Sequence, residues 1–396
     1  MIETKEKQYL MRSYGRLPIS FERGSGVWLW DSENNRYLDA LCGIAVTGIG
    51  HSNPDVNNAI INQIKNLSHV SNLYRIGKQE QLAEKLCRIS NMQNVFFCNS
   101  GSEANEAAIK LMRLFGQQKG IKEPQILVME KAWHGRSLAT LTATGSVLAQ
   151  KGFGPLLPGF CRVAFNDIDS VKDILDHNQD LVGVLVEPIQ GEAGIQIPDK
   201  KYLIELRAIC DDREILLGLD EVQSGMGRTG KWFAHQHHDI TPDVMTLAKG
   251  LGNGFPIGAC LATGLAADLF QPGSHGSTFG GNPVGCAAAA AVISFIEKEN
   301  LLTRAGILGE KIIKSLTERL VGNPSVNQIR GSGLMIAVEL KTKCSDLPRK
   351  ALGEGILINV TGENTIRLLP PLILSNEEAE QIVAKVVSLI ENHDNN

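Results

Sequence analysis

Short runs rich in valine, isoleucine and leucine alternate with amphipathic stretches between about residue 90 and residue 265. Within a run the apolar residues are consecutive rather than alternate, which is typical of strands buried on both faces. The runs are NVFFC, QILVME, CRVAF, LVGVLVEP, ILLGLDEV, VMTLA and IGACLAT, and the amphipathic stretches include 102–115 and 200–213. This pattern predicts an α/β fold whose large domain has a mostly parallel sheet with helices on both faces.

The pattern changes on both sides of this region. Residues 283–322 are predicted to be helical, and the apolar runs GLMIAVEL, GILINV and TIRLLPPLIL precede a last amphipathic segment at 375–392. This order predicts a smaller α+β domain. The stretch GVWLWDSENNRYLDAL resembles a hairpin around Ser32–Asn35, and we expect it to join the smaller lobe. The predicted division is residues 1–50 as an N-terminal segment, 51–290 as the large domain and 291–396 as the small domain.

Composition narrows the class of partner. The 396-residue chain has a formal net charge of -4, and its basic residues are scattered, so a small molecule is a better partner than nucleic acid or an anionic membrane. The eight cysteines form no C-x-x-C pair and no metal-ligand spacing, which favours a reducing compartment. The start, MIETKEKQYLMRS, lacks the apolar segment of a secretory signal, and no apolar run has membrane-spanning length. We therefore predict a cytoplasmic protein.

Two charged residues carry the strongest chemical signal. Asp220 ends the strand-like run ILLGLD, and Lys249 follows the next run, VMTLA, at the start of a glycine-rich loop. An acid in such a place can hold a pyridine nitrogen protonated, and a lysine there can bond to an aldehyde, as a pyridoxal phosphate enzyme requires. The alternatives are an arginine or lysine partner for Asp220 and a surface position for Lys249.

Three further motifs allow both structural and functional interpretations. In NSGSEANEAA, Ser100 and Glu103 form a capping box, and the same helix N-terminus could hold a phosphate. In AWHGRSLAT, Trp133 and Arg136 are either a packed ring and a surface cation, or a stacking face and a carboxylate ligand. Arg367, within the apolar run TIRLLPPL, forms either a salt bridge within its lobe or a bond to a substrate carboxylate.

Other motifs are interpreted as structural. GMGRTGK at 225–231 is followed by Trp232 where a nucleotide-binding loop needs Ser or Thr, and GLGNG at 250–254 has the wrong glycine spacing for a dinucleotide site. HQHHD at 235–239 has no distant partner ligands, so we predict solvated histidines and no metal.

Seven motifs, in this order, resemble those of the class III pyridoxal phosphate aminotransferases: GSEANEAA, AWHGR, VEPIQGE, LDEVQSGMGRTG, TLAKGLGNGFPIGA, HGSTFGGNP and RLLPPL. The likeness covers nearly the whole chain. SYGRLPISFERGSGVWLWD, LDALCGIAVTGIGH and SNLYRIGKQEQLAEKL are most similar to the acetylornithine branch of that class. The resemblance implies a fold-type I architecture, with a seven-stranded sheet, a homodimer and active sites shared between subunits.

The resemblance also implies residue roles. Lys249 would bond to the cofactor and act in catalysis with Asp220, which would hold the ring nitrogen. The cofactor-binding residues would be Gly101 and Ser102 at the phosphate, Trp133 and Val222 against the ring, Gln223 at the phenolic oxygen, and Thr278 from the neighbouring subunit. The substrate would meet Arg136, Ser277 and Arg367, with Glu187 pairing with Arg367 when no carboxylate is bound.

The implied reaction transfers an amino group from N2-acetyl-L-ornithine to 2-oxoglutarate, giving N-acetylglutamate 5-semialdehyde and L-glutamate in arginine biosynthesis. Thr47 stands where this branch commonly has Asn, so other donors stay open: succinylornithine, ornithine, N-succinyl-diaminopimelate or 4-aminobutyrate. An aminomutase of the same fold, which moves an amino group within one molecule, is disfavoured by Arg367. A binding protein without catalysis is disfavoured by the presence of Lys249 and Asp220.

Overall fold

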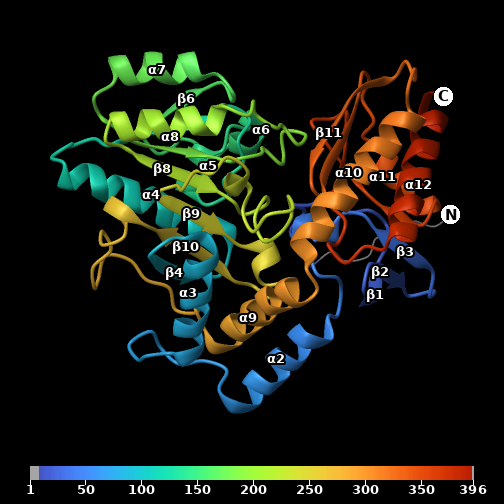
Figure 1. The fold of residues 1–396 in the computed structure, drawn as a ribbon, viewed down its shortest axis with the longest axis horizontal. Helices are drawn as coiled ribbons and strands as arrows, with labels where there is room; N and C mark the ends of the chain where they lie inside the picture. Colours follow the sequence, from blue (N-terminus) through green and yellow to red (C-terminus); the bar gives the residue numbers. More distant parts are fainter. Residues whose placement is uncertain (1–8, 395–396) are drawn as a thin grey trace.

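The computed structural model describes residues 9–394. The first eight and the last two residues lie outside the described residues. They include part of the predicted terminal segments and of the start MIETKEKQYLMRS. A large sheet covered by helices occupies one side of the molecule (Figure 1). Smaller sheets occupy the other side, together with α10 (Leu301–Arg319), α11 (Leu347–Gly353) and α12 (Asn376–Asp394). No helix among residues 9–394 combines the length and the apolar composition needed to cross a membrane.

Seven strands form the large sheet, and they are the seven apolar runs that the sequence predicts. β10 runs antiparallel to both of its neighbours, whereas the other neighbouring pairs are parallel. The α/β prediction with a mostly parallel sheet is therefore confirmed. In spatial order the strands are β4 (Asn94–Cys98), β10 (Gly258–Ala262), β9 (Val244–Leu247), β8 (Leu216–Asp220), β7 (Leu181–Val186), β5 (Gln125–Met129) and β6 (Phe160–Val163).

Both faces of this sheet are covered, which explains why its strands are apolar at consecutive positions. In β5, Ile126 and Val128 pack in a cluster with α4 (Gly101–Gln118), while Leu127 and Met129 pack with α7 (Ile168–His177) and α8 (Tyr202–Asp212). Successive side chains of a strand point to opposite faces, so a strand between two helical layers needs apolar residues throughout. Shorter or flanking helices are α1 (Cys42–Ala45), α2 (Pro54–Asn66), α3 (Gly77–Ser90), α5 (Leu138–Ala143), α6 (Val147–Gln150) and the 3-10 turns η1 (Ala234–His237), η2 (Lys249–Leu251) and η3 (Gly264–Ala266).

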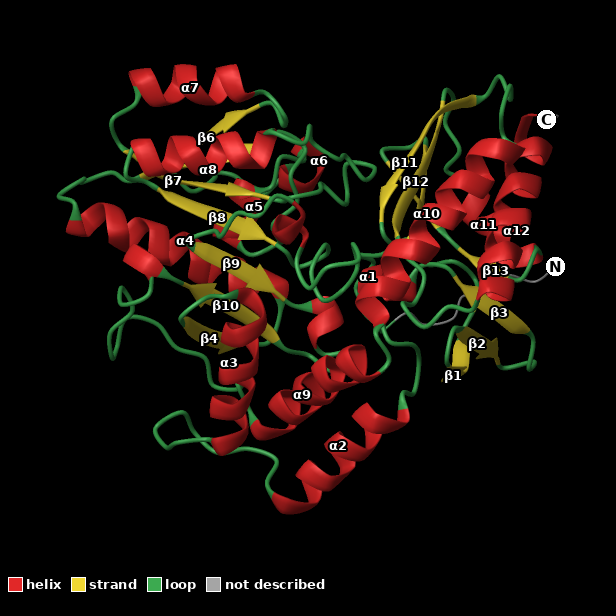
Figure 2. Cartoon of the chain, in the orientation of Figure 1, coloured by secondary structure: helices red, strands yellow, loops and turns green. Residues whose placement is uncertain are grey.

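The other side of the molecule contains two four-stranded sheets (Figure 2). One has the order β11 (Val326–Ser332), β12 (Met335–Leu340), β15 (Thr365–Leu368) and β14 (Asn359–Thr361). The other joins β1 (Phe21–Ser25), β2 (Trp28–Asp31) and β3 (Arg36–Asp39) to β13 (Ile356–Leu357). β2 and β3 form the predicted hairpin, whose turn is held because the Asp31 carboxylate accepts from Asn35 N at 2.8 Å. The helices here are α10 (Leu301–Arg319), α11 (Leu347–Gly353) and α12 (Asn376–Asp394).

The region 283–322, predicted to be helical, consists of two helices rather than one. The structure has α9 (Pro283–Lys298) and α10, separated at Asn300, whose φ of 49° is left-handed. Asparagine tolerates the left-handed conformation better than most residues do. A residue in this conformation cannot continue a right-handed helix, so the helix is interrupted here. α9 packs against α2 and α3 at the large sheet, whereas α10 packs against β11 and α12. The break therefore redirects the chain from one side of the molecule to the other.

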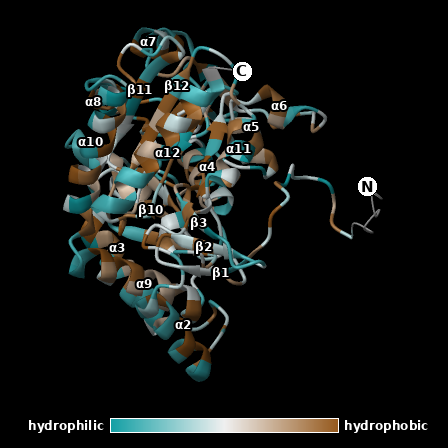
Figure 3. Cartoon of the chain, turned by 90° about the vertical axis from the view of Figure 1, so that its right-hand side faces the viewer, coloured by the Kyte–Doolittle hydropathy of each residue, from teal (hydrophilic) through white to brown (hydrophobic). Residues whose placement is uncertain are grey.

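Ahead of β1, the chain projects from the body (Figure 3). Tyr9, Leu10, Met11 and Tyr14 on this arm are exposed by 91%, 68%, 89% and 73%. This is a group of large apolar side chains on one exposed segment, and monomeric proteins seldom expose such a group.

The contact of α10 with the β11–β12 turn yields a stability prediction. A Cβ at Gly309 would lie 2.0 Å from Gly333 O, whereas one at Gly306, a turn earlier in the same helix, would meet nothing closer than 4.0 Å. We expect Gly309→Ala to lower the free energy of unfolding by about 1–3 kcal/mol, because the backbone must shift. Gly306→Ala, the matched control, should raise it by up to about 1 kcal/mol through helix propensity. Urea unfolding measures both; equal effects would contradict the close packing.

Candidate active site

A cavity of about 610 Å³ opens at the edge where the parallel strands end. Its walls come from the segments that follow β4, β5, β7, β8 and β9, and from residues 255–257 just before the antiparallel β10. Carboxyl ends of parallel strands are the usual place for ligands in such sheets. Nine of the predicted site residues line this cavity: Gly101, Ser102, Trp133, Arg136, Glu187, Asp220, Val222, Gln223 and Lys249.

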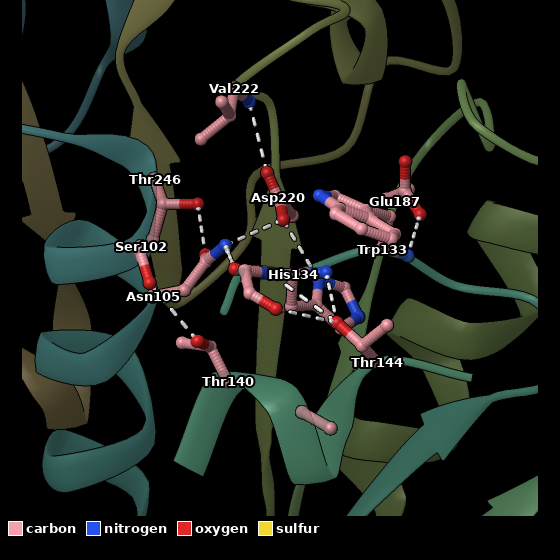
Figure 4. Close-up of polar contacts among 12 residues, drawn as sticks. Ser102, Asn105, Trp133, His134, Thr140, Thr144, Glu187, Asp220, Val222 and Thr246 are labelled. Carbon is pink, nitrogen blue, oxygen red and sulfur yellow. Dashed lines mark hydrogen bonds and ion pairs between the residues drawn. The ribbon is translucent and has the colours of Figure 1, made fainter. Parts of the chain in front are cut away.

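Asp220 ends β8 as a buried carboxylate, 4% exposed. Its Oδ2 accepts from Asn105 Nδ2 at 2.7 Å and lies 2.8 Å from His134 Nδ1, and its Oδ1 accepts from Val222 N at 3.0 Å (Figure 4). The alternative of an arginine or lysine partner is therefore wrong, and the partner is an imidazole. Because a carboxylate only accepts hydrogen bonds, the proton of this contact belongs on His134 Nδ1. With these partners Asp220 also lines the cavity.

Lys249 follows β9 and faces the cavity beside Asp220. Its φ of 43° is left-handed, which is uncommon for a side chain with Cβ and is found often at functional sites. Among the described residues its Nζ has no hydrogen-bond or ion-pair partner. Burial lowers the pKa of this amine, partly offset by the Glu192 carboxylate, and Arg367 lowers it further. A surface position for Lys249 is excluded, and the arrangement favours a neutral, nucleophilic amine.

The amino end of α4 lies against the same cavity. Ser100 caps the helix by accepting from Glu103 N at 3.2 Å, so the structural interpretation of this motif is correct. It does not exclude a ligand, because the cap leaves Gly101 and Ser102 on the cavity wall. A Cβ at Gly101 would lie 2.8 Å from Val222 Cγ1, which explains the glycine. Ser102 Oγ lies 2.9 Å from Ser137 Oγ and 3.1 Å from Thr140 Oγ1, a group of three hydroxyls.

Trp133 and Arg136 follow β5 and contact each other. The Arg136 guanidinium lies over the Trp133 ring, 4.7 Å from its centroid, and no acid pairs with it among the described residues. The Trp133 backbone N–H donates to Glu187 Oε1 at 2.8 Å, and Gly191 N donates to Oε2 at 3.1 Å. Burial raises the pKa of Glu187 to about 7. The cavity thus presents a cation, a flat ring and a carboxyl group that titrates near neutrality.

Arg367 lies on β15 behind Gln223 and is fully buried. Its Nη1 pairs with Glu192 Oε1 at 2.7 Å and lies 3.3 Å from Gln223 Oε1, and its Nε donates to Asn359 at 3.1 Å. Nη2 has no hydrogen-bond partner among the described residues. The predicted pairing of Glu187 with Arg367 is wrong, because Glu187 is occupied by the backbone of Trp133 and Gly191. Glu192, the second acid of VEPIQGE, pairs with Arg367 instead.

The sequence interpretation missed Glu192, His134 and Asn105. Arg367 outweighs the effect of burial and keeps the pKa of Glu192 below its usual value. His134 stands between Trp133 and Arg136 in AWHGR, and nothing in this motif shows that its side chain is buried. Asn105 had a usable signal, because it is a polar residue among the buried alanines of α4.

Ser277 and Thr278 do not line the main cavity of this chain. They line a neighbouring cavity of about 510 Å³, which shares Asn99 with the first. Ser277 Oγ accepts from Asn99 Nδ2 at 3.2 Å, so the two cavities are linked through this amide. A role across a subunit boundary for Thr278 therefore stays a prediction.

Among the histidines of 235–239, His235 differs from the prediction of solvated side chains, whereas His237 is exposed and His238 is partly exposed. His235 is 1% exposed, and its Nδ1 lies 3.1 Å from the buried Glu221 carboxylate. The same carboxylate accepts from Ser224 Oγ at 2.6 Å and from Ala234 N at 3.0 Å. His235 therefore satisfies a buried acid that directly follows Asp220 and faces away from the cavity.

Comparison with known proteins agrees with this geometry. The sequence profile of the family Aminotransferase class-III matches residues 9–390. The chain belongs to the class III aminotransferases. It is 52% identical to the acetylornithine aminotransferase of Nitrosomonas europaea, over 96% of this chain and 97% of that protein.

Solved structures of class III aminotransferases share the whole fold. The crystal structure of ornithine aminotransferase from Toxoplasma gondii has a TM-score of 0.95 and 30% identity, covering 98% of this chain and 93% of that one. A second structure of the Toxoplasma enzyme, crystallized with oxidized glutathione, has PLP at partial occupancy in its active site. It matches with a TM-score of 0.93 at 30% identity, over 96% and 92% of the two chains. The predicted membership of this class and the α/β fold are confirmed.

The lowered pKa of Lys249 gives a prediction that needs no ligand. Acetic anhydride acetylates only the neutral form of an amine. In the ligand-free protein, the rate of acetylation should therefore reach its midpoint at a lower pH for Lys249 than for the exposed Lys172. Peptide mass spectrometry of samples labelled across a pH series measures both midpoints in one protein. A Lys249 midpoint at or above that of Lys172 would contradict the lowered pKa.

Proposed function

We propose that this protein is a pyridoxal phosphate aminotransferase that transfers the amino group of N2-acetyl-L-ornithine to 2-oxoglutarate. The observation that carries this proposal is the joint position of Lys249 and Asp220, a nucleophilic amine and a buried anion on the wall of one cavity. The acetylornithine donor is supported by the relative at 52% identity, which matches over nearly its full length.

The cavity fits pyridoxal phosphate at each chemically distinct group. The amino end of α4 with Gly101 and Ser102 suits the phosphate, and Trp133 offers a stacking face opposite Val222. Asp220 suits the ring N–H, Gln223 the phenolic oxygen, and Lys249 the aldehyde. Gly101 allows Val222 to lie close to this helix end, because a Cβ there would be 2.8 Å from Val222 Cγ1. Thr278 would complete the phosphate site from a partner subunit.

Catalysis then depends on a few groups of this chain. When bound, pyridoxal phosphate withdraws electrons from the carbon that carries the substrate's amino group. Asp220 holds the positive charge on the ring nitrogen that this withdrawal needs. Lys249 Nζ, whose pKa is lowered by burial, would accept the proton from the substrate carbon that carries the amino group and deliver it to the carbon to which that amino group is transferred. Both half-reactions use the same groups, which gives a ping-pong cycle with glutamate as the second product.

The two arginines account for two different substrates at one site. Arg136 and Arg367 together suit a dicarboxylate such as 2-oxoglutarate, and the unpartnered Nη2 of Arg367 is ready for a second hydrogen bond. A donor with one carboxylate needs one arginine only. We infer that the Glu192–Arg367 ion pair then stays closed, so that the unused cation is not left unpaired in the protein interior behind Gln223. Ser277 would lie beside the substrate.

We further propose a homodimer in the cytoplasm. The large apolar side chains exposed at Tyr9–Tyr14 support a surface that a second subunit covers. Tyr14 also lines the main cavity, so this surface adjoins the proposed active site. The aminotransferase alternatives differ in the donor: succinylornithine, ornithine, N-succinyl-diaminopimelate or 4-aminobutyrate. Thr47 would affect this choice. An aminomutase would not need 2-oxoglutarate.

The cofactor and the donor can be tested in one experiment. The visible band of the purified protein with pyridoxal phosphate should fall when N-acetylornithine is added and return when 2-oxoglutarate follows, because the amino group passes through the cofactor. If the absorbance of the band is unchanged by N-acetylornithine but falls with another donor, that donor is the substrate instead. No band would contradict the role of Lys249.

Loss of the Lys249 amine should abolish turnover. We expect Lys249→Ala to keep the assembly state and the melting temperature of the wild type and to show no activity in the coupled glutamate assay. Lys172→Ala, an exposed lysine outside the cavity, is the control and should keep wild-type activity. Persistent turnover in Lys249→Ala would exclude the assignment.

Arg367 should matter more for the acceptor than for the donor. Arg367→Lys keeps the charge beside Glu192 but loses the planar fork, so kcat/KM for 2-oxoglutarate should fall by about tenfold or more. Single-turnover reaction with N-acetylornithine should change little. Arg207→Lys removes the fork from another largely buried arginine–carboxylate pair, with Asp243, and serves as the control. Equal losses for donor and acceptor would refute selective binding of the dicarboxylate.

A further inference from the structure

Two buried residues behind Asp220 form a chain of hydrogen bonds that leads away from the cavity. Asn105 on α4 is 1% exposed and Thr246 on β9 is fully buried. Asn105 lines the cavity, whereas Thr246 does not. Neither residue has a role in the chemistry described above.

The contacts fix the orientation of the Asn105 amide. Thr246 Oγ1 donates to Asn105 Oδ1 at 2.7 Å, and Asn105 Nδ2 donates to Asp220 Oδ2 at 2.7 Å and to the His134 carbonyl at 2.8 Å (Figure 4). Both neighbours of Nδ2 are acceptors only, so an amide turned the other way would place oxygen against oxygen. Each polar atom of this side chain therefore has the partner that its chemistry requires.

The same contacts connect three elements of the fold. Asn105 belongs to α4, Thr246 to β9 and Asp220 to β8, while His134 follows β5. Asn105 thus supports Asp220 directly and also holds the backbone that carries the imidazole at 2.8 Å from Asp220 Oδ2. The charged groups facing Asp220 from the cavity side, Lys249 and Glu187, make no hydrogen bond to it among the described residues.

We propose that Asn105, held by Thr246, is a positioning residue that keeps Asp220 ionised and aimed at the ring nitrogen of the cofactor. This inference rests on the proposed function, because it assumes that Asp220 meets a protonated pyridine nitrogen. Asn105 acts through Asp220 and not on the substrate.

A pair of ligands isolates the contact. The ligand-free protein is titrated with pyridoxal phosphate and with the analogue that has a C–H group in place of the ring nitrogen, and the two dissociation constants are measured by tryptophan fluorescence. The analogue has the same phosphate, aldehyde and ring face but cannot donate to Asp220. The ratio of the two constants therefore reports the contact between Asp220 and the ring nitrogen, and general damage to the site cancels.

Asn105→Asp is the sharpest variant because it is nearly isosteric. The new carboxyl would face the Asp220 carboxylate and the His134 carbonyl, so the two acids must share a proton and Asp220 loses anionic character. We expect the preference for pyridoxal phosphate over the analogue to fall by about tenfold or more, the scale of one hydrogen bond to a charged group.

Thr246 gives a second test if Asn105→Asp does not fold. Thr246→Val removes the hydroxyl and leaves Asn105 Oδ1 without its donor, so the preference should fall by roughly threefold, the scale of a neutral hydrogen bond. Thr246→Ser keeps the hydroxyl and should restore the wild-type ratio. Ser90→Ala is the matched control, because Ser90 is 2% exposed and donates to Leu86 O at 2.7 Å far from Asp220; its ratio should not change.

The outcomes separate this inference from the proposed function. A wild type that binds both ligands equally would refute the role of Asp220 itself, and with it the proposed site. A wild type that prefers pyridoxal phosphate, together with Thr246→Val and Asn105→Asp variants of unchanged ratio, would overturn the positioning role alone. Melting curves establish that each variant is folded before its ratio is compared.

Discussion

The burial of a carboxylate at the end of β8 is the constraint on which the site depends. An unpaired charge at this depth would cost several kcal/mol, so the fold must supply donors to Asp220. They come from three separate segments: Asn105 on α4, His134 after β5, and the backbone of Val222. These donors belong to different elements. The hydrogen bonds of Asp220 therefore depend on the order of the strands in the sheet and on the packing of α4 against it.

The second constraint is the fully buried Arg367 at the junction of the two sides of the molecule. It stands on β15, and its acidic partner, Glu192, lies in the loop after β7 of the large sheet. That loop is anchored by Arg330 of β11, whose guanidinium donates to the carbonyls of Gly194 and Ile195. Ile195 has a left-handed φ of 53°, an uncommon conformation for a β-branched residue. The loop is thus held in one shape by the lobe that carries Arg367.

Much of the fold could be read from the chain because the signals are local. Consecutive apolar residues gave the seven strands, and Asp31 with the polar residues after it gave the hairpin of β2 and β3. The break at Asn300 was missed, since an asparagine between two helical periods is compatible with one long helix until packing fixes its φ. His235 was misread for a related reason: the polarity of HQHHD does not reveal that Glu221, fourteen residues earlier, is buried and needs it.

By itself the sequence determined the alternation of strands and helices, the reactive residues Asp220 and Lys249, and the family to which their motifs belong. These depend on residue type and short spacing, which a chain displays directly. The tertiary structure decided which partners those residues have: His134 and Asn105 for Asp220, and Glu192 rather than Glu187 for Arg367. Acids five residues apart are chemically equal in a sequence, and they differ only once a turn presents one to the backbone and the other to an arginine from the far side of the molecule.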